Sequence, residues 1–173
     1  MEGERTMDFH TERLYFRRYV EGDFPFLYSL LTDPETVRYI GDGKPKDRKG
    51  AKDFLDWIYR TYRAGEKLGL MVLVRKSDGE RIGHAGWVPQ IIEREEVIEV
   101  GYWLSPAFIG QGYASEAAAF LLQQGKKHLN DKRLVALIQP GNTASQKVAK
   151  KVGMRWNKEI MLDGRTVDLY STE

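Results

Sequence analysis

A chain of 173 residues, of which 42% are hydrophobic and 12% aromatic, is long enough to bury one hydrophobic core, so we expect a single domain over residues 1–173. Its 27 basic and 25 acidic residues nearly balance, which gives no indication of a nucleic-acid partner. The sequence contains no cysteine, which excludes disulfides, thiolate zinc ligands and a cysteine nucleophile. His10, His84 and His128 lie at no metal-ligand spacing, and no apolar run approaches membrane-spanning length. We therefore expect a cytoplasmic protein with no metal site and no membrane partner.

The first half of the chain alternates strand-like and helical patterns. Aromatic and apolar residues cluster before the first acidic turn, and later apolar positions recur at near-helical spacing. Glycine and proline mark the ends of the helical segments. The expected elements are a strand at 14–18, a helix from 21 to about 31 that Asp33 and Pro34 end, a mobile loop from 37 to 49, and a helix through Phe54, Ile58 and Tyr62 that Ala64 and Gly65 close.

The rest of the chain contains further strand-like runs and two helical segments. We expect strands at 70–75, 81–88 and 97–104, separated by a hairpin turn at 77–79 and the charged stretch 93–96, then an alanine-rich helix ending near His128, a strand at 134–138, a helix from 143 to 152 that Gly153 stops, and a strand at 166–170. This order predicts an α+β fold built on a central mixed sheet.

A glycine loop, Gly110-Gln111-Gly112-Tyr113-Ala114, joins a predicted strand to the alanine-rich helix. Small residues let the backbone approach a ligand, and the helix N-terminus adds about half a positive charge, so the loop is able to hold a pyrophosphate. Taken alone, two glycines at this spacing are more typical of an ordinary tight turn. The loop lacks the lysine of a nucleoside-triphosphate site, and four antiparallel-looking strands precede it, unlike in a dinucleotide-binding fold.

Several motifs in order along the chain resemble the GNAT superfamily of acetyl-CoA-dependent N-acetyltransferases, in particular the branch of ribosomal-protein N-terminal acetyltransferases. These motifs are Thr11-Glu12-Arg13-Leu14-Tyr15-Phe16-Arg17, Ile82-Gly83-His84-Ala85-Gly86, Glu99-Val100-Gly101-Tyr102-Trp103-Leu104, Gly110-Gln111-Gly112-Tyr113-Ala114-Ser115-Glu116-Ala117, Asn142-Thr143-Ala144-Ser145 and Lys151-Val152-Gly153-Met154. The resemblance implies a GNAT-like fold, with a mostly antiparallel sheet flanked by helices on both faces, and acetyl-CoA as the acetyl donor.

The same resemblance implies a set of cofactor-binding residues. Backbone amides of Ile109, Gly110, Gln111, Gly112, Tyr113 and Ala114 would bind the coenzyme A pyrophosphate, Leu104 would line the pantetheine arm where two strands splay apart, Asn142 would hydrogen-bond the pantetheine or its surroundings, and Ser145 would lie near the thioester sulfur. The family's loop usually begins with arginine or glutamine, whereas this chain has Ile109 there. Phosphate binding would therefore depend on backbone amides more than on a side-chain cation.

Acetyl transfer to an amine by direct attack in a ternary complex requires a proton acceptor and some protonation of the leaving thiolate. Strand alternation places Glu99 and Trp103 on one face, so Glu99 is the candidate base; a solvated or ion-paired glutamate is the alternative. Many relatives use a tyrosine on the motif helix as the acid. Ala149 stands at the corresponding position, so Ser145 is the candidate acid.

The acceptor is expected to be a primary amine, either a protein or peptide N-terminus or a small amine such as an aminoglycoside or polyamine. The segment 38–49 and the helix through Trp57 correspond to the region that covers the acceptor in relatives. Glu93, Glu95 and Glu96 form an acidic stretch that either attracts a cationic acceptor or is a solvated turn. The alternative function is a non-catalytic coenzyme A sensor or interaction module, and the protein would be a monomer or a homodimer.

Overall fold

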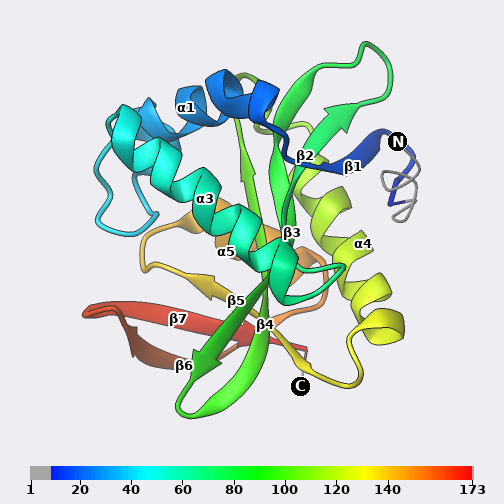
Figure 1. The fold of residues 1–173 in the computed structure, drawn as a ribbon. Coiled ribbons are helices and arrows are strands. Elements are labelled where there is room, and N and C mark those ends of the chain that lie inside the picture. Colours follow the sequence, from blue (N-terminus) through cyan, green and yellow to red (C-terminus); the bar gives the residue numbers. More distant parts are fainter. Residues whose placement is uncertain (1–8, 173) are drawn as a thin grey trace.

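The computed structural model describes residues 9–172, in which seven strands form one open mixed sheet (Figure 1). The strands are β1 (Leu14–Arg18), β2 (Gly69–Arg75), β3 (Arg81–Ile92), β4 (Glu95–Leu104), β5 (Arg133–Ile138), β6 (Arg155–Leu162) and β7 (Arg165–Ser171). Their order across the sheet is β1-β2-β3-β4-β5-β7-β6. Among the described strands, β4 and β5 form the parallel pair, and the other neighbours are antiparallel.

Helices cover both faces of this sheet (Figure 1). They are η2 (Glu21–Asp23), α1 (Phe24–Thr32), α2 (Pro34–Val37), α3 (Arg48–Ala64), η3 (Pro106–Phe108), α4 (Tyr113–His128) and α5 (Thr143–Lys151). The buried side chains of α4 and α5 pack on one face, and those of α1 and α3 pack on the other. The expected α+β class, the mixed and mostly antiparallel sheet and the helices on both faces are confirmed.

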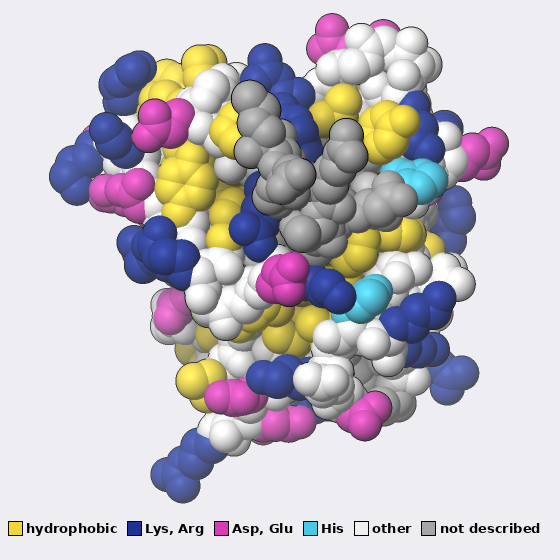
Figure 2. Space-filling model, turned by 45° about the vertical axis from the view of Figure 1, so that its right-hand side comes forward, with side chains coloured by type: hydrophobic (Ala, Val, Ile, Leu, Met, Phe, Trp, Pro, Cys, Tyr) yellow, Lys and Arg dark blue, Asp and Glu magenta, His cyan; other side chains and the backbone are white. Residues whose placement is uncertain are grey.

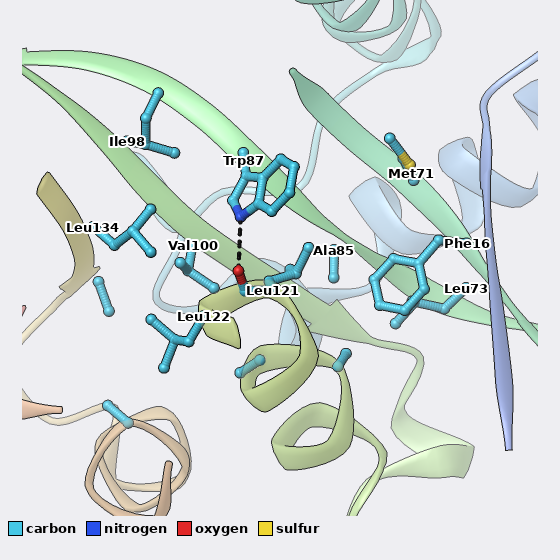
Figure 3. Close-up of a cluster of buried hydrophobic side chains, with 14 of the residues drawn as sticks. Phe16, Met71, Leu73, Ala85, Trp87, Ile98, Val100, Leu121, Leu122 and Leu134 are labelled. Carbon is cyan, nitrogen blue, oxygen red and sulfur yellow. Dashed lines mark hydrogen bonds between the residues drawn. The ribbon is translucent and has the colours of Figure 1, made fainter. Parts of the chain in front are cut away.

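The larger hydrophobic core lies between α4 and the strands (Figure 3). Small residues Ala117 and Ala118 let α4 approach the sheet closely, while Leu121 of the same helix fills the space beside Trp87. The Trp87 side chain is 1% exposed, and its indole Nε1 donates a hydrogen bond to the Leu121 carbonyl oxygen at 3.1 Å. This bond pairs a polar group that would otherwise be buried without a partner, and it holds α4 against β3.

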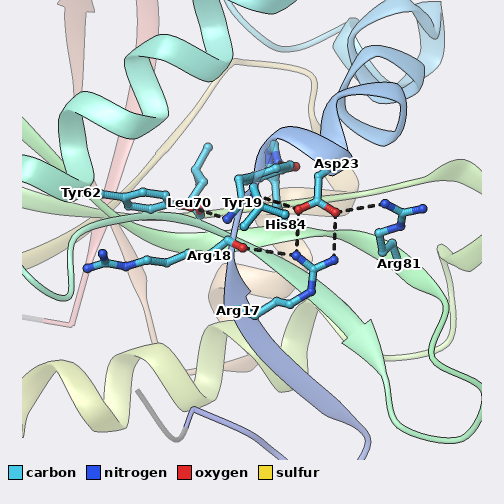
Figure 4. A network of polar contacts seen from close by, with 9 residues as sticks. Arg17, Arg18, Tyr19, Asp23, Tyr62, Leu70, Arg81 and His84 are labelled. Atoms are coloured by element: carbon cyan, nitrogen blue, oxygen red, sulfur yellow. Dashed lines mark hydrogen bonds and ion pairs between the residues drawn. The ribbon is translucent and has the colours of Figure 1, made fainter. Parts of the chain in front are cut away.

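A polar network lies on the opposite face, beneath α1 (Figure 4). Asp23 is 1% exposed and accepts hydrogen bonds from two Arg17 nitrogens at 2.7 and 2.8 Å and from Arg81 at 3.0 Å. Burial alone would raise the pKa of Asp23, but these hydrogen bonds and one from the Val20 amide outweigh it, and the net pKa is lowered. The network therefore joins β1, η2 and β3 through one buried carboxylate.

The described surface carries mixed charge. On the face shown in Figure 2, basic and acidic side chains are interspersed, so this face does not present a single sign of charge. Within residues 9–172, no helix is long and apolar enough to cross a membrane, and no group of three or more potential ligand residues is placed to hold a metal ion.

The structure differs from the sequence-based elements at three places. β6 was not predicted at all, and β3 extends four residues beyond the expected end, to Ile92. The turn between β3 and β4 therefore shrinks to Glu93 and Arg94, whose φ angles of 50° and 71° suit a two-residue hairpin turn. The segment that begins with Asp33 is not simply a helix end, because the Asp33 carboxylate accepts a hydrogen bond from the Thr36 amide at 2.8 Å and starts α2.

Candidate active site

The parallel strands β4 and β5 separate in the middle of the sheet. They pair at only three positions, ending with Glu99 opposite Val135. Beyond that point β4 continues to Leu104 beside β3, while β5 continues to Ile138 beside β7. We call this separation the fork; it leaves the facing edges of the two strands without each other as hydrogen-bond partners.

A cavity of about 560 Å³, here called the cleft, opens at the fork. Its walls come from β4 residues 99–104, β5 residues 136–138, the glycine loop with the start of α4, the first turns of α5, and the segment 35–40. Of the predicted site residues, the cleft brings together Glu99, Leu104, Ile109, Gly110, Gly112, Tyr113, Ala114, Asn142 and Ser145. Gln111 is the predicted loop residue that lies outside this lining.

The glycine loop forms the end of the cleft at the N-terminus of α4. Gly110 and Gly112 adopt φ angles of 86° and 84°, a conformation that side chains rarely tolerate, and Gly112 is the residue that caps the helix. The first amides of a helix have no partner within it, so those of Tyr113 and Ala114 are available to an anion. The Ile109 N–H, predicted to take part in binding the pyrophosphate, donates to the Pro106 carbonyl oxygen at 3.3 Å.

Arg13, which directly precedes β1, contacts this loop and is not among the residues that line the cleft. Its guanidinium stacks on the Tyr113 ring at 4.2 Å, its Nη1 donates to the Gln111 carbonyl oxygen at 2.9 Å, and its Nε donates to Glu116 Oε1 at 2.7 Å. Sequence reasoning did not assign Arg13 to the site. About 100 residues separate it from the loop, so no local signal identifies the contact.

Glu99 lines the cleft at the fork itself. Its carboxylate Oε1 accepts a hydrogen bond from Gln90 Nε2 at 2.9 Å, so its partner is a neutral amide rather than a cation. Burial raises the pKa of Glu99, and the Gln90 hydrogen bond only partly opposes that effect. A carboxylate with a raised pKa is a better proton acceptor near neutral pH than an ordinary glutamate.

A pair of hydroxyl groups faces the cleft from α5 and β4. Ser145 lies in the first turn of α5, where its amide donates to the Asn142 side-chain oxygen at 3.2 Å. Its Oγ lies 3.3 Å from Tyr102 Oη, which also donates to the Ser145 carbonyl oxygen at 3.1 Å. Burial raises the pKa of Tyr102 to about 12, partly opposed by Ser145, while the nearby Glu99 charge raises it further.

The position at which many relatives carry an acid tyrosine on the motif helix is Ala149 here, and the tyrosine hydroxyl at this site comes from a different element. Ala149 is fully buried, with 0% exposure, and offers no proton donor. Tyr102 supplies a hydroxyl from β4 instead, in contact with the predicted Ser145. Sequence reasoning gave Tyr102 no chemical role.

The segment 35–40 covers one side of the cleft, with Glu35, Thr36, Tyr39 and Ile40 in the lining. This segment is held to the β5–α5 connection, because Gln139 Nε2 donates to the Gly41 carbonyl oxygen at 2.9 Å. The helix α3, expected to share in covering the acceptor, contributes no residue to the lining among those described. Its Trp57 packs instead against the core beneath α3.

The acidic stretch at the β3–β4 turn lies outside the cleft lining. Glu93 is paired with Lys158 at 2.5 Å, Glu96 with Lys132 at 3.1 Å, and Glu95 with Arg133 at 3.9 Å. All three glutamates are exposed, and such surface pairs contribute little stability each. The structure therefore favours the interpretation of this stretch as a solvated turn.

Comparisons with known proteins agree with this architecture. Residues 13–155 match the family described as acetyltransferase (GNAT) domain. The uncharacterised protein YkkB of Bacillus subtilis is 34% identical over 161 residues, covering 92% of each chain, and the uncharacterised N-acetyltransferase p20 of Bacillus licheniformis is 31% identical over 168 residues, covering 93% of this chain and 92% of that one. The ribosomal L7/L12 α-N-protein acetyltransferase RimL, solved in complex with coenzyme A, superposes with a TM-score of 0.73 at 18% identity, covering 92% and 93% of the two chains.

The fold and these relatives first define the class of protein: the chain is an N-acetyltransferase. More particularly, it belongs to the GNAT acetyltransferase family, as the sequence motifs predicted. The alternative of a non-catalytic module is therefore not retained.

Proposed function

We propose that this enzyme transfers an acetyl group from acetyl-CoA to a primary amine by direct attack within a ternary complex. The observation that carries the proposal is the continuity of the cleft, whose lining includes both the N-terminal residues of α4 and the half-buried Glu99. One end suits the anionic diphosphate of the donor, and the other suits an acceptor that must lose a proton. The coenzyme A complex of RimL, a structural neighbour, supports the same donor.

In this proposal the donor extends along the cleft from the glycine loop to the fork. Amides of residues 110–114 hold the diphosphate, and Leu104 lies beside the pantetheine arm. The facing edges of β4 and β5 beyond the fork offer backbone N–H and C=O groups, which need partners when covered, and the pantetheine arm carries amide groups that can supply them. Asn142 Oδ1 is occupied by the Ser145 amide, so its side-chain NH₂ is the group left for the donor.

The proposed chemistry takes place at the fork. The amine nitrogen forms a bond to the acetyl carbonyl carbon, and the bond from that carbon to sulfur breaks. Glu99 accepts the proton that leaves the nitrogen, directly or through water, because its raised pKa favours proton uptake. In the structure the Tyr102 hydroxyl donates to the Ser145 carbonyl oxygen and the Ser145 hydroxyl donates to Tyr102 Oη. In the proposed step one of these hydroxyls turns its proton from that acceptor and donates a hydrogen bond to the developing thiolate.

The acceptor enters, on this proposal, from the side covered by segment 35–40. Glu35 adds a second carboxylate to the lining, and Tyr39 and Trp103 add aromatic side chains. Carboxylates and aromatic rings together attract protonated amines, which supports a cationic acceptor. A peptide N-terminus and a small polyamine share this chemistry, and RimL is named as an α-N-protein acetyltransferase.

An acceptor screen with acetyl-CoA tests the proposal. Thiol release should be saturable in both substrates and should depend on the amine, and calorimetry should show coenzyme A binding to the protein without any acceptor. Peptides with a free α-amino group are compared with the same peptides after N-terminal blocking, and with a panel of small amines. The proposal fails if coenzyme A does not bind, or if thiol is released at the same rate whether or not an amine is present.

A further inference from the structure

We propose that Arg13 is a positioning residue for the diphosphate, which orients the Gln111–Gly112 peptide from outside the cleft and neutralises Glu116 beside it. This inference rests on the proposed function, because it concerns how the loop binds the donor. The loop of this chain begins with Ile109, at a position where the family usually has an arginine or a glutamine. Ile109 brings no side-chain cation to the loop, and Arg13, which is far away in the sequence, instead holds the loop and pairs with Glu116.

Arg13 fixes the direction of the Gln111–Gly112 peptide bond. In a trans peptide, the carbonyl oxygen and the amide hydrogen point in opposite directions. The Gln111 carbonyl oxygen is held by Arg13 Nη1 at 2.9 Å, and neither Gln111 nor Arg13 is among the residues that line the cleft. The N–H of Gly112, which belongs to the same peptide plane, must therefore point away from Arg13, and Gly112 itself lines the cleft. Losing the Arg13 contact would free this peptide to rotate, since glycine tolerates many backbone conformations.

Arg13 also neutralises the negative charge of Glu116. Glu116 lies in the first turn of α4, close to the amides proposed to bind the diphosphate. Burial alone would raise the pKa of Glu116, but hydrogen bonds from Thr11 and Arg13 outweigh it, so the pKa is lowered and the group is a carboxylate. An unpaired carboxylate at this position would repel an incoming diphosphate. Arg13 pairs with it through Nε at 2.7 Å, which cancels that repulsion.

Several contacts hold the Arg13 side chain in place. The Arg13 backbone amide donates to Glu116 Oε2 at 3.0 Å, and the Thr11 hydroxyl donates to the same oxygen. The guanidinium is also stacked on Tyr113. With its Nε, its Nη1 and its planar face all engaged, the Arg13 side chain has one orientation, and the loop is positioned before the donor arrives.

Three variants test the inference. Arg13→Met keeps a long side chain over Tyr113 but removes every donor, and Arg13→Lys keeps the charge but not the planar pair of donors. Lys132→Ala removes one partner of the surface pair with Glu96 and serves as the matched control. Each is measured by calorimetry with coenzyme A, by thermal unfolding, and by kcat/KM with acetyl-CoA and with S-acetylpantetheine, a donor that has no diphosphate.

We expect Arg13→Met to weaken coenzyme A binding about tenfold, the size of one lost hydrogen bond between a charged and a neutral group. Its kcat/KM ratio of acetyl-CoA to S-acetylpantetheine should fall by a similar factor, with Arg13→Lys between it and the wild type. An equal fall with both donors would show that Arg13 only supports the fold and would overturn the inference. Unchanged coenzyme A binding in Arg13→Met would overturn the inference as well, but the proposed function would still stand as long as the wild-type protein binds coenzyme A. If the wild-type protein does not bind coenzyme A, both the inference and the proposed function are refuted.

Discussion

Tyr102→Phe is the substitution that best tests the chemistry at the fork. The hydroxyl of Tyr102 has a pKa of about 12, whereas a thiol such as that of coenzyme A has a pKa of about 8.5. Complete proton transfer from Tyr102 to the thiolate is therefore uphill by about 3.5 pKa units, or about 5 kcal/mol. In the proposed mechanism Tyr102 is therefore a hydrogen-bond donor to the thiolate and not a full acid.

A hydrogen bond to a charged group contributes about 1.5–3 kcal/mol, so Tyr102→Phe should lower kcat about 10- to 100-fold. The variant also loses the bond to the Ser145 carbonyl oxygen, which should cost about 1 kcal/mol of the free energy of unfolding. Steady-state thiol release at saturating substrates gives kcat, and denaturant unfolding gives the stability. Ser145→Ala is the companion variant, because it removes the Oγ at 3.3 Å but keeps the Tyr102 hydroxyl.

The assigned role of Tyr102 is refuted if Tyr102→Phe lowers kcat for thiol release less than threefold, or if the fold-loss in kcat changes with pH near neutrality. A hydroxyl with a pKa of about 12 stays protonated throughout the neutral range, so the loss should be the same at every pH there. A larger loss in Ser145→Ala than in Tyr102→Phe would instead make Ser145 the main donor.

Three further substitutions test other parts of the structure. Glu99→Gln should lower kcat by about 10²- to 10⁴-fold and remove the acidic limb of the pH profile of kcat/KM. In the wild type this limb should lie above the ordinary pH range of glutamate, because burial raises the Glu99 pKa. An unaltered pH profile would exclude the role of Glu99 as the base. Gly112→Trp should abolish coenzyme A binding in calorimetry, because a side chain is strained at a φ of 84° and its Cβ would lie 3.3 Å from Arg13 Nη2, so the loop has to shift; circular dichroism should still show the native secondary structure. Asp23→Asn should cost about 2 kcal/mol at pH 7 in denaturant unfolding, the size of a hydrogen bond to a charged group. Since the folded-state pKa of Asp23 is lowered, its contribution is present above the ordinary aspartate pKa and is lost as the pH falls through the folded-state value, so the variant's stability should depend less on acidic pH.

The parts of the fold that the sequence predicted are those with a strong local pattern. β1 and α3 were found because their apolar residues recur at strand or helix spacing, and the glycine loop because it precedes an alanine-rich helix. β6 was missed because it is an edge strand with one buried residue, Ile160. Its large apolar side chains Trp156 and Met161 are instead 56% and 68% exposed. A strand with so little burial shows no alternation of polar and apolar residues.

The site was predictable to the extent that single elements define it. The placement of Glu99 followed from strand alternation, and that of Gly112 from the loop. The contacts of Arg13 with the loop and of Tyr102 with Ser145 join residues about 98 and 43 positions apart, as their hydrogen bonds show. Such contacts depend on how strands and helices pack, which no local pattern contains.

The two chemical groups at the fork are held in different ways, and this separates their expected mutational behaviour. Glu99 is the last residue of β4 paired on both sides, with Val88 of β3 and Val135 of β5, so two ladders fix its backbone. Tyr102 lies beyond the fork, where only β3 pairs with β4, and its hydroxyl is positioned by the first turn of α5. Residues on rigid strands keep their geometry when a neighbouring helix shifts, so changes in α5 should affect the hydroxyl pair while leaving the carboxylate in place.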